Sequence, residues 1–144
     1  MNFTQGLKAT GNIVQATPQD LFDRLSTVFR FSLDVCALPE NAKCHRYFTP
    51  EIDGLKQKWS GGVWCNPPYG KEIGLWVQKA CSEIKESYCD FIVMLLPART
   101  DTRWFQDYVL GKSSLYFLKG RLKFGDSKTG APFPSVIAVY TKFN

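Results

Sequence analysis

Two short apolar segments with a helical segment between them constrain the fold of this chain more than any other feature. Val63-Trp64-Cys65 is typical of a compact buried strand, and residues 90–96 form a second apolar run that stops at Pro97. Between them, apolar residues recur at helical spacing over residues 73–84. Strands that alternate with helices predict a three-layer α/β fold with a mostly parallel sheet, whose ligand sites lie at the carboxyl ends of the strands.

Similar patterns predict the remaining elements. Thr17 precedes Pro18, which predicts a capping hydroxyl and a proline at the first position of a helix. A further helix is expected over residues 101–110, and strands over residues 31–36, 115–118 and 136–140, the last two forming an antiparallel edge. Residues 43–48 fit a short strand, residues 50–54 and 60–62 fit turns, and residues 1–11 a loose arm.

The size and charge of the chain indicate one basic domain. Its 144 residues, 44% of them apolar by type, suffice for a single core. Lys and Arg number 18 against 13 Asp and Glu, and the net charge of +5 favours a polyanionic partner. We therefore expect one domain over residues 1–144.

The cysteines, the lone histidine and the apolar runs exclude several other classes. Five cysteines without an export signal predict free thiols and a cytoplasmic protein. No C-x-x-C pair accompanies His45, so no metal site is expected. The longest apolar run, residues 91–96, is far shorter than the roughly 20 residues of a membrane span, so no membrane association is expected.

The segment Asn66-Pro67-Pro68-Tyr69 is the strongest candidate for chemistry. The Asn66 side-chain carbonyl and the Pro67 backbone carbonyl can both accept hydrogen bonds from an exocyclic amine, and neither proline offers a competing N–H. Two such acceptors would leave the nitrogen lone pair able to attack an electrophilic methyl group, and the Tyr69 ring offers a face for stacking. Taken alone, these residues also fit a strand that two prolines terminate.

Cys65 is a poor candidate for a nucleophile. Cytosine C5 methylation uses a thiolate in a Pro-Cys dipeptide, and this sequence contains no such dipeptide. Cys65 lies within an apolar run and is expected to pack inside a strand.

Several ordered blocks over residues 17–140 resemble the phage-type DNA N6-adenine methyltransferase (Dam) family, which belongs to the S-adenosylmethionine-dependent amino-methyltransferases. The resemblance is carried by residues 17–22, 33–37, 47–49, 53–55, 64–70, 96–102 and 120–124. It implies a Rossmann-like methyltransferase fold and transfer of a methyl group from S-adenosylmethionine to N6 of a flipped-out adenine in DNA by direct displacement. Asn66, Pro67, Pro68 and Tyr69 match the family's catalytic loop, in which Tyr69 stacks on the base.

The same resemblance implies the cofactor residues. Those for S-adenosylmethionine are Thr17, Pro18, Asp34, Cys36, Ala37 and Asp53. By this resemblance, Asp34 accepts a hydrogen bond from the α-ammonium of the cofactor and Asp53 contacts the amine of its adenine. A structural role in a turn or a helix cap remains the alternative for Thr17, Asp34 and Asp53. A Gly-x-Gly turn found in many relatives is replaced by residues 36–39, and the short interval before Asp53 predicts a compressed cofactor side. The residue that holds the ribose hydroxyls stays open, with Asn41 and Glu51 considered.

Contacts to DNA are expected from a basic segment near the C-terminus. Lys119, Arg121, Lys123 and Lys128 would bind phosphates, and Phe124 or Phe133 would face the flipped base opposite Tyr69. A solvated hairpin with its phenylalanines in the core is the alternative.

The segments that carry the resemblance leave no room for a separate target-recognition domain, and the oligomeric state is not predicted. Rival functions are methylation of cytosine N4, an RNA base or a protein glutamine, and a non-catalytic nucleic-acid-binding domain.

Overall fold

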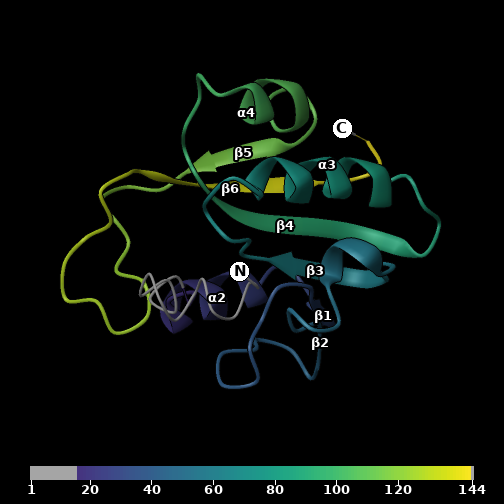
Figure 1. Cartoon of the computed structure of the whole chain (residues 1–144), viewed down its shortest axis with the longest axis horizontal. Coiled ribbons are helices and arrows are strands. Elements are labelled where there is room, and N and C mark those ends of the chain that lie inside the picture. The colour runs from purple at the N-terminus through teal and green to yellow at the C-terminus, as the bar shows by residue number, and fades with distance from the viewer. Residues whose placement is uncertain (1–15, 144) are drawn as a thin grey trace.

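The computed structural model describes residues 16–143, which form one mixed sheet with flanking helices (Figure 1). The elements in chain order are α2 (Gln19–Ser26), β1 (Leu33–Asp34), β2 (Arg46–Tyr47), the short 3-10 helix η2 (Gly54–Lys56), β3 (Gly61–Cys65), α3 (Ile73–Glu83), β4 (Cys89–Pro97), α4 (Arg103–Tyr108), β5 (Ser114–Phe117) and β6 (Ser135–Tyr140). The six-stranded sheet has the order β2-β1-β3-β4-β6-β5. Strands β2, β1, β3 and β4 are parallel, and β6 is antiparallel to β4 and β5. The expected mostly parallel α/β sheet with an antiparallel edge is confirmed.

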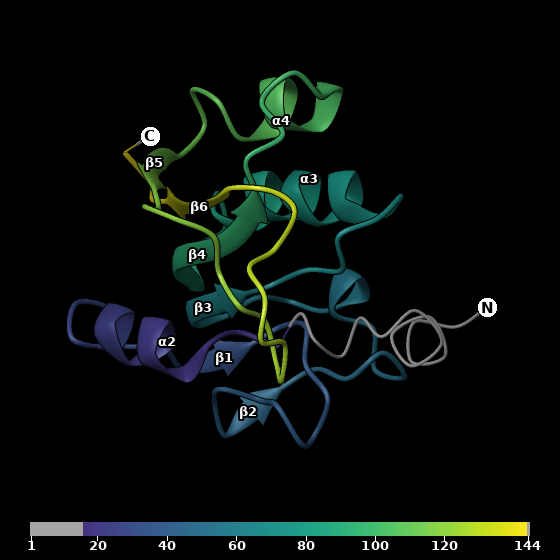
Figure 2. The same cartoon turned by 90° about the vertical axis from the view of Figure 1, so that its left-hand side faces the viewer.

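Apolar side chains cover both faces of this sheet. On one face, α3 and α4 pack against a cluster that includes Val63, Cys65, Ile92, Met94, Leu96, Val136 and Ala138. On the other face, α2 packs against Trp64, Val93, Leu95, Ile137 and Val139. Figure 2 shows α3 and α4 on one side of the strands and α2 on the other. Because residues alternate between two buried faces, β3 and β4 have the near-continuous apolar sequences that identified them.

The connection between β1 and β2 contains no helix. Residues 35–45 form bends and turns, so the parallel partner strand follows β1 through a short loop. The Asp34 carboxylate accepts from the backbone N–H of Cys36 at 3.2 Å and of Lys43 at 3.0 Å. Both ends of the loop are therefore tied to one side chain, and the predicted compression of this side of the sheet is confirmed.

The turn predicted at residues 60–62 is wrong, because Gly61 and Gly62 belong to β3. A Cβ on Gly62 would lie 2.4 Å from the Arg30 carbonyl oxygen and 2.5 Å from the Phe91 ring. Gly61 has a φ of 82° at a shift in the register with β4. Gly62 therefore allows close packing and Gly61 a bulge within the strand. Glycine is also common in turns, so the residue type alone does not distinguish the two structures.

The predicted start of the first helix is also corrected. Pro18 is the N-cap of α2, and no side chain caps that helix. The hydroxyl of Thr17 accepts a hydrogen bond from Asn66 instead. The cap alternative for Thr17 is therefore wrong.

The carboxyl ends of β3 and β4 lie at the same edge, and residues 118–134, the β5–β6 loop, cross it (Figure 2). The loop is held at both ends, because Leu118 N–H donates to the Ser135 carbonyl at 3.1 Å and Ala98 N–H donates to the Pro134 carbonyl at 2.9 Å. No strand forms within the loop, although Ala131 N–H donates to the Leu122 carbonyl across it at 2.8 Å. Phe124 is buried and Phe133 packs against the same core cluster, as the alternative reading of this segment expected.

The structure bears on three simpler expectations. All five cysteines are free, and Cys65 is buried in β3 as predicted. Within residues 16–143, no group of three or more His, Cys, Asp or Glu side chains could hold a metal ion. No helix in the same range is long and apolar enough to cross a membrane. The arm predicted for residues 1–11 lies outside the described residues.

Candidate active site

The Asn-Pro-Pro-Tyr loop begins directly after β3, at the carboxyl edge of the sheet. The Asn66 side-chain amide donates from Nδ2 to the Thr17 hydroxyl oxygen at 3.1 Å, and its Oδ1 atom is buried. Thr17 is 7% exposed and Pro67 is buried. The hydrogen bond fixes the plane of the amide and directs its oxygen away from Thr17.

Tyr69 is held by the neighbouring strand and by two phenylalanines. Its hydroxyl donates to the Leu95 carbonyl of β4 at 2.9 Å. Its ring lies edge-on to Phe124 and Phe133, with centroids 5.9 and 5.6 Å away. The guanidinium of Arg99 lies 5.5 Å from the centre of the Phe133 ring. The two phenylalanines expected opposite Tyr69 are thus in contact with it, while their stacking on a base stays a prediction.

Residues 16 and 17 connect the catalytic loop to the β5–β6 loop. The Ala16 carbonyl accepts from Gly125 N–H at 3.0 Å, one residue before the Thr17 hydroxyl that binds Asn66. Phe124, next to Gly125, is 5% exposed and packs into the cluster beneath α2. The segment before α2, the Asn66 loop and the β5–β6 loop therefore form one packed unit.

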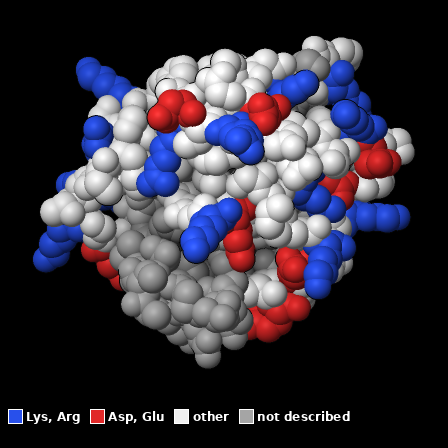
Figure 3. Space-filling view, turned by 45° about the horizontal axis from the view of Figure 1, so that its top comes forward, with Lys and Arg blue, Asp and Glu red and all other residues white. Residues whose placement is uncertain are grey.

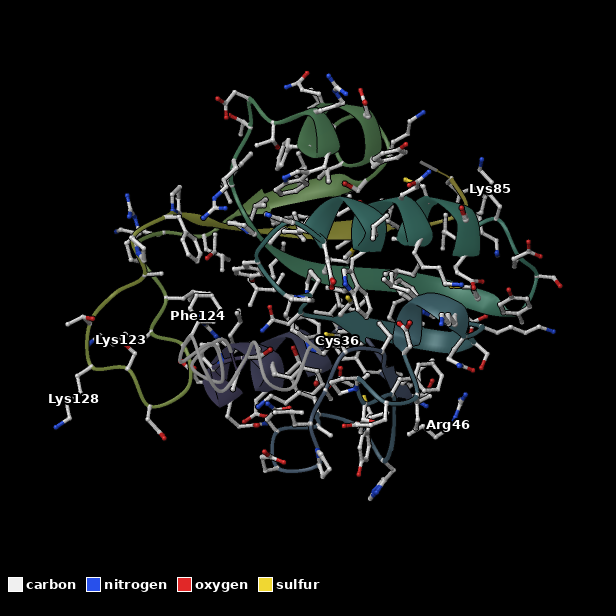
Figure 4. All side chains as sticks on the ribbon, in the orientation of Figure 1. Cys36, Arg46, Lys85, Lys123, Phe124 and Lys128 are labelled. Atoms are coloured by element: carbon white, nitrogen blue, oxygen red, sulfur yellow. The ribbon has the colours of Figure 1, made fainter. Side chains whose placement is uncertain are left out.

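A cavity of about 260 Å³ opens beside this unit, where β1 and β2 end. Its lining residues are Val35, Cys36, Ala37, Phe48, Thr49, Pro50, Asp53, Gly54, Leu55, Glu72, Leu75 and Trp76. Three of the residues predicted for the cofactor, Cys36, Ala37 and Asp53, belong to this wall, and Figure 4 shows Cys36 near the centre of the molecule. Thr17, Pro18 and Asp34 do not line it.

Asp53 has an unusual backbone conformation at this cavity. Its φ of 64° is the only positive value among the described residues other than glycine. Its carboxylate accepts from Leu55 N–H at 3.1 Å, which starts η2. A non-glycine residue held in this region is strained by about 1–3 kcal/mol, and such strain concentrates at ligand sites.

Asp34 is buried at the end of β1, 2% exposed. Burial is the largest influence on its pKa and raises it to about 7, against the opposing effect of the hydrogen bonds from Lys43 and Cys36. The predicted turn role is confirmed by these two bonds. Contact with a cofactor ammonium stays a prediction.

The four basic residues predicted to bind phosphates are all exposed on the β5–β6 loop. Figure 4 shows Lys123 and Lys128 on the outer side of this loop, whereas Phe124 lies toward the body of the protein. Arg121 also closes the loop, since its guanidinium donates to the Ala131 carbonyl at 3.2 Å. On the face that carries α3 and α4, charges of both signs are interspersed (Figure 3).

Sequence reasoning did not identify two residues of the cavity wall, Glu72 and Trp76. Trp76 belonged to the helical apolar pattern, and it stacks on Trp59 with centroids 6.2 Å apart. Glu72 is the N-cap residue of α3, directly after the Asn66 loop. The closeness of the Glu72 carboxylate to Asn66-Pro67-Pro68-Tyr69 in the sequence was the signal that could have identified it.

The parallel strands, the cavity at their carboxyl ends and the adjoining Asn66 loop define an α/β domain of the class in which ligand sites lie at the carboxyl edge of the sheet.

Comparison with known proteins identifies the family within this class. A family model described as DNA N-6-adenine-methyltransferase (Dam) matches residues 6–139, and the chain belongs to this family of adenine-specific DNA methyltransferases. The DNA N-6-adenine-methyltransferase of Haemophilus phage HP1 (strain HP1c1) is 31% identical over 119 residues, which cover 80% of this chain and 68% of that protein. The DNA N-6-adenine-methyltransferase of Escherichia phage T1 is 33% identical over 95 residues, 64% of this chain and 39% of that protein. The expected family and its reaction, methylation of adenine N6 in DNA, are confirmed.

Replacing the Thr17 hydroxyl tests whether it positions Asn66. Thr17→Val removes the acceptor for the Asn66 amide but keeps the shape of the side chain, so we expect a loss of about 1–3 kcal/mol in the free energy of unfolding. Methyl transfer should fall at least tenfold, because the amide loses its orientation. Thr17→Ser retains the hydroxyl and should stay close to wild type in both denaturant unfolding and methyl-transfer assays. Full activity of a folded Thr17→Val protein would contradict this role.

The burial of Asp34 predicts a pH dependence of stability. The raised pKa means that the folded state binds the proton more tightly than the unfolded state, whose pKa is near 3.8. The stabilisation from this group is complete below pH 3.8 and is lost as the pH rises to about 7. We expect the free energy of unfolding of wild type, relative to Asp34→Asn, to fall between pH 5 and pH 7 and then level off. The free energies of unfolding are measured by urea titration. If the difference between wild type and Asp34→Asn stays constant or rises between pH 5 and pH 7, the raised pKa of Asp34 is contradicted.

Proposed function

We propose that this chain methylates N6 of an adenine rotated out of DNA, that S-adenosylmethionine is the methyl donor, and that Asn66 holds the amine. The observation that carries the proposal is the half-buried Asn66 side chain at the carboxyl edge of β3, whose amide is oriented by Thr17 and whose Oδ1 atom is buried. An adenine within a duplex cannot reach a buried side chain, so the base must leave the stack at a cost of a few kcal/mol.

Asn66 and Pro67 would act on the amine by accepting its hydrogens. An amine held by the Asn66 side-chain oxygen and the Pro67 carbonyl would have its lone pair drawn out of conjugation with the ring, so that it can attack a methyl group. The bound cofactor supplies an electrophilic methyl group, and the transfer forms the N6–C bond, breaks the S–C bond and releases a proton from the amine. Because the acceptors are fixed before the base arrives, their contribution is one of orientation and electrostatics.

Tyr69 is suited to stack on the base because its position is fixed at both ends. The hydroxyl is bound to β4, and the ring is in contact with Phe124 and Phe133 of the β5–β6 loop. These two phenylalanines extend the aromatic surface that surrounds the position beside Asn66. Stacking of a base on such a surface is worth about 1–3 kcal/mol.

The residues at the cavity fit the adenosine half of S-adenosylmethionine. The volume of about 260 Å³ is close to the lower limit, roughly 300 Å³, of small-molecule sites. Asp53 offers a carboxylate to an amine, and residues 36–37 provide backbone at the end of β1. Thr17, Pro18 and Asp34 lie outside this wall and are proposed to face the methionine half. The parallel order β2-β1-β3-β4, with helices on both faces, supports a Rossmann-like three-layer methyltransferase fold.

DNA would bind along the β5–β6 loop. Between residues 119 and 128, four cations are accompanied by one acid, Asp126. The loop crosses the edge at which the Asn66 loop lies, so phosphates next to a flipped adenine would meet exposed lysines. Within this chain we propose that the loop also contributes to target recognition.

Asn66→Ala tests the catalytic assignment. We expect methyl transfer to fall by about 10²–10³ or more, the effect of removing one positioned hydrogen-bonding group. S-adenosylhomocysteine binding, measured by calorimetry, should remain within threefold of wild type. The activity assay uses labelled S-adenosylmethionine and DNA, followed by nucleoside analysis, with Gln78→Ala, an exposed amide on α3 outside the site, as the control. Full activity of Asn66→Ala contradicts the role of Asn66, and label in N4-methylcytosine would overturn the choice of adenine.

Neutralising the lysines of the β5–β6 loop tests the DNA surface. Lys119, Lys123 and Lys128 are changed together to Gln, while Arg121 is kept because it closes the loop. Each lost phosphate contact should reduce the slope of log K against log salt by about 0.9. A control with Lys85 and Lys112 changed to Gln keeps the loop intact, and Figure 4 shows Lys85 at the opposite end of the molecule. An unchanged affinity and salt slope in the triple variant would show that DNA binds elsewhere.

A further inference from the structure

We propose that the carboxylate of Glu72 binds the ribose hydroxyls of the cofactor, an inference that rests on the proposed use of S-adenosylmethionine. Glu72 lines the cavity and is the N-cap residue of α3. The two residues considered from the sequence for this role, Asn41 and Glu51, are not in the cavity wall. Asn41 uses its side-chain oxygen to accept from Leu38 N–H at 2.8 Å.

The Glu72 carboxylate is not used to stabilise the fold. Although Glu72 is the N-cap residue of α3, its side chain makes no capping hydrogen bond. Lys79 and Glu83 form the only salt bridge found within residues 16–143, so Glu72 takes part in none there. The carboxylate is exposed at the wall of the cavity, where a ligand can reach it.

The two carboxylates of the cavity differ in the acceptors they have left. Asp53 already accepts from Leu55 N–H through Oδ1. Glu72 offers two oxygens, which match the two O–H donors of a vicinal diol. The other carboxylate oxygen of Asp53, Oδ2, can accept one hydrogen bond from the N–H of an amine. Assigning the ribose to Glu72 and the adenine amine to Asp53 therefore satisfies both groups.

The electrostatics of Cys36 support the placement of Glu72 at this wall. Burial is the main cause of the raised pKa of the Cys36 thiol, and the charges of Asp34, Glu72 and Asp53 raise it further. Negative charge from these carboxylates thus converges on the end of β1. The ligand groups that relieve this concentration of charge are hydrogen-bond donors, such as hydroxyls and amines.

The location of Glu72 links two parts of the site. It follows Tyr69 by three residues, through Gly70 and Lys71. One short segment would then contact the adenine through Tyr69 and the ribose through Glu72. The acid that follows β2, Glu51, comes after Phe48, Thr49 and Pro50 and does not line the cavity, which leaves Glu72 and Asp53 as its acidic residues.

The test measures binding of S-adenosylhomocysteine and of its 2′,3′-dideoxy analogue by calorimetry. Wild type should bind the dideoxy analogue about 100-fold more weakly, the loss expected for hydrogen bonds to a charged group. Glu72→Ala should bind S-adenosylhomocysteine about 100-fold and Glu72→Gln about tenfold more weakly than wild type, because neutral acceptors form weaker bonds. Glu72→Ala should also bind the two ligands within threefold of each other. Glu86→Gln, at the other end of α3, should match wild type.

Two outcomes separate this inference from the proposed function. If wild type binds S-adenosylhomocysteine and methylates DNA, but the folded Glu72→Ala protein still distinguishes the two ligands as wild type does, only the assignment of Glu72 is overturned. If wild type does not bind S-adenosylhomocysteine, the proposed cofactor and the role of Glu72 fail together. Thermal unfolding of each variant checks its fold independently of any ligand.

Discussion

The two hydrogen bonds accepted by Asp34 are the interaction on which the arrangement of the site depends. They hold residues 35–43 in a compact loop, so that β2 can pair with β1 without an intervening helix. The cavity opens at the end of this strand pair, and its walls come from the loop after β1, the loop after β2 and the start of α3. The Asp34 carboxyl, which accepts from two backbone N–H groups, thus takes the place of a connecting helix between β1 and β2. The cavity at the end of these strands remains open to a ligand.

Local patterns predicted the strands, the helices and the Asn66 loop well. The central strands are buried on both faces, which produces apolar runs such as residues 90–96 that are readable in a single sequence. Pro67 and Pro68 mark the end of β3 because neither can donate to the ladder. The position of Asn66 at the carboxyl edge follows from these two facts alone. The roles assigned to its side chain and to the cofactor residues came from the family resemblance.

The features that sequence reasoning missed depend on contacts between distant segments. Gly62 lies in a strand because Arg30 and Phe91 approach its Cα, and neither approach is visible locally. Thr17 has the sequence of a helix cap, yet its hydroxyl binds an amide 49 residues away. Glu72 reaches the cavity only because α3 starts beside the loops after β1 and β2. In each case the residue type permits two structures, and tertiary packing selects one.

The β5–β6 loop carries exposed lysines, the buried Phe124 and the partly buried Phe133 on a single stretch of backbone whose two ends are anchored to the sheet. Such a segment can gain or lose residues near its tip without altering β5, β6 or the Asn66 loop, because surface loops absorb changes in length at small entropic cost. Evolution can therefore diversify the surface proposed to bind DNA while the residues around Asn66 stay constant. The same property makes the loop a natural place to graft or randomise residues when a new target preference is sought.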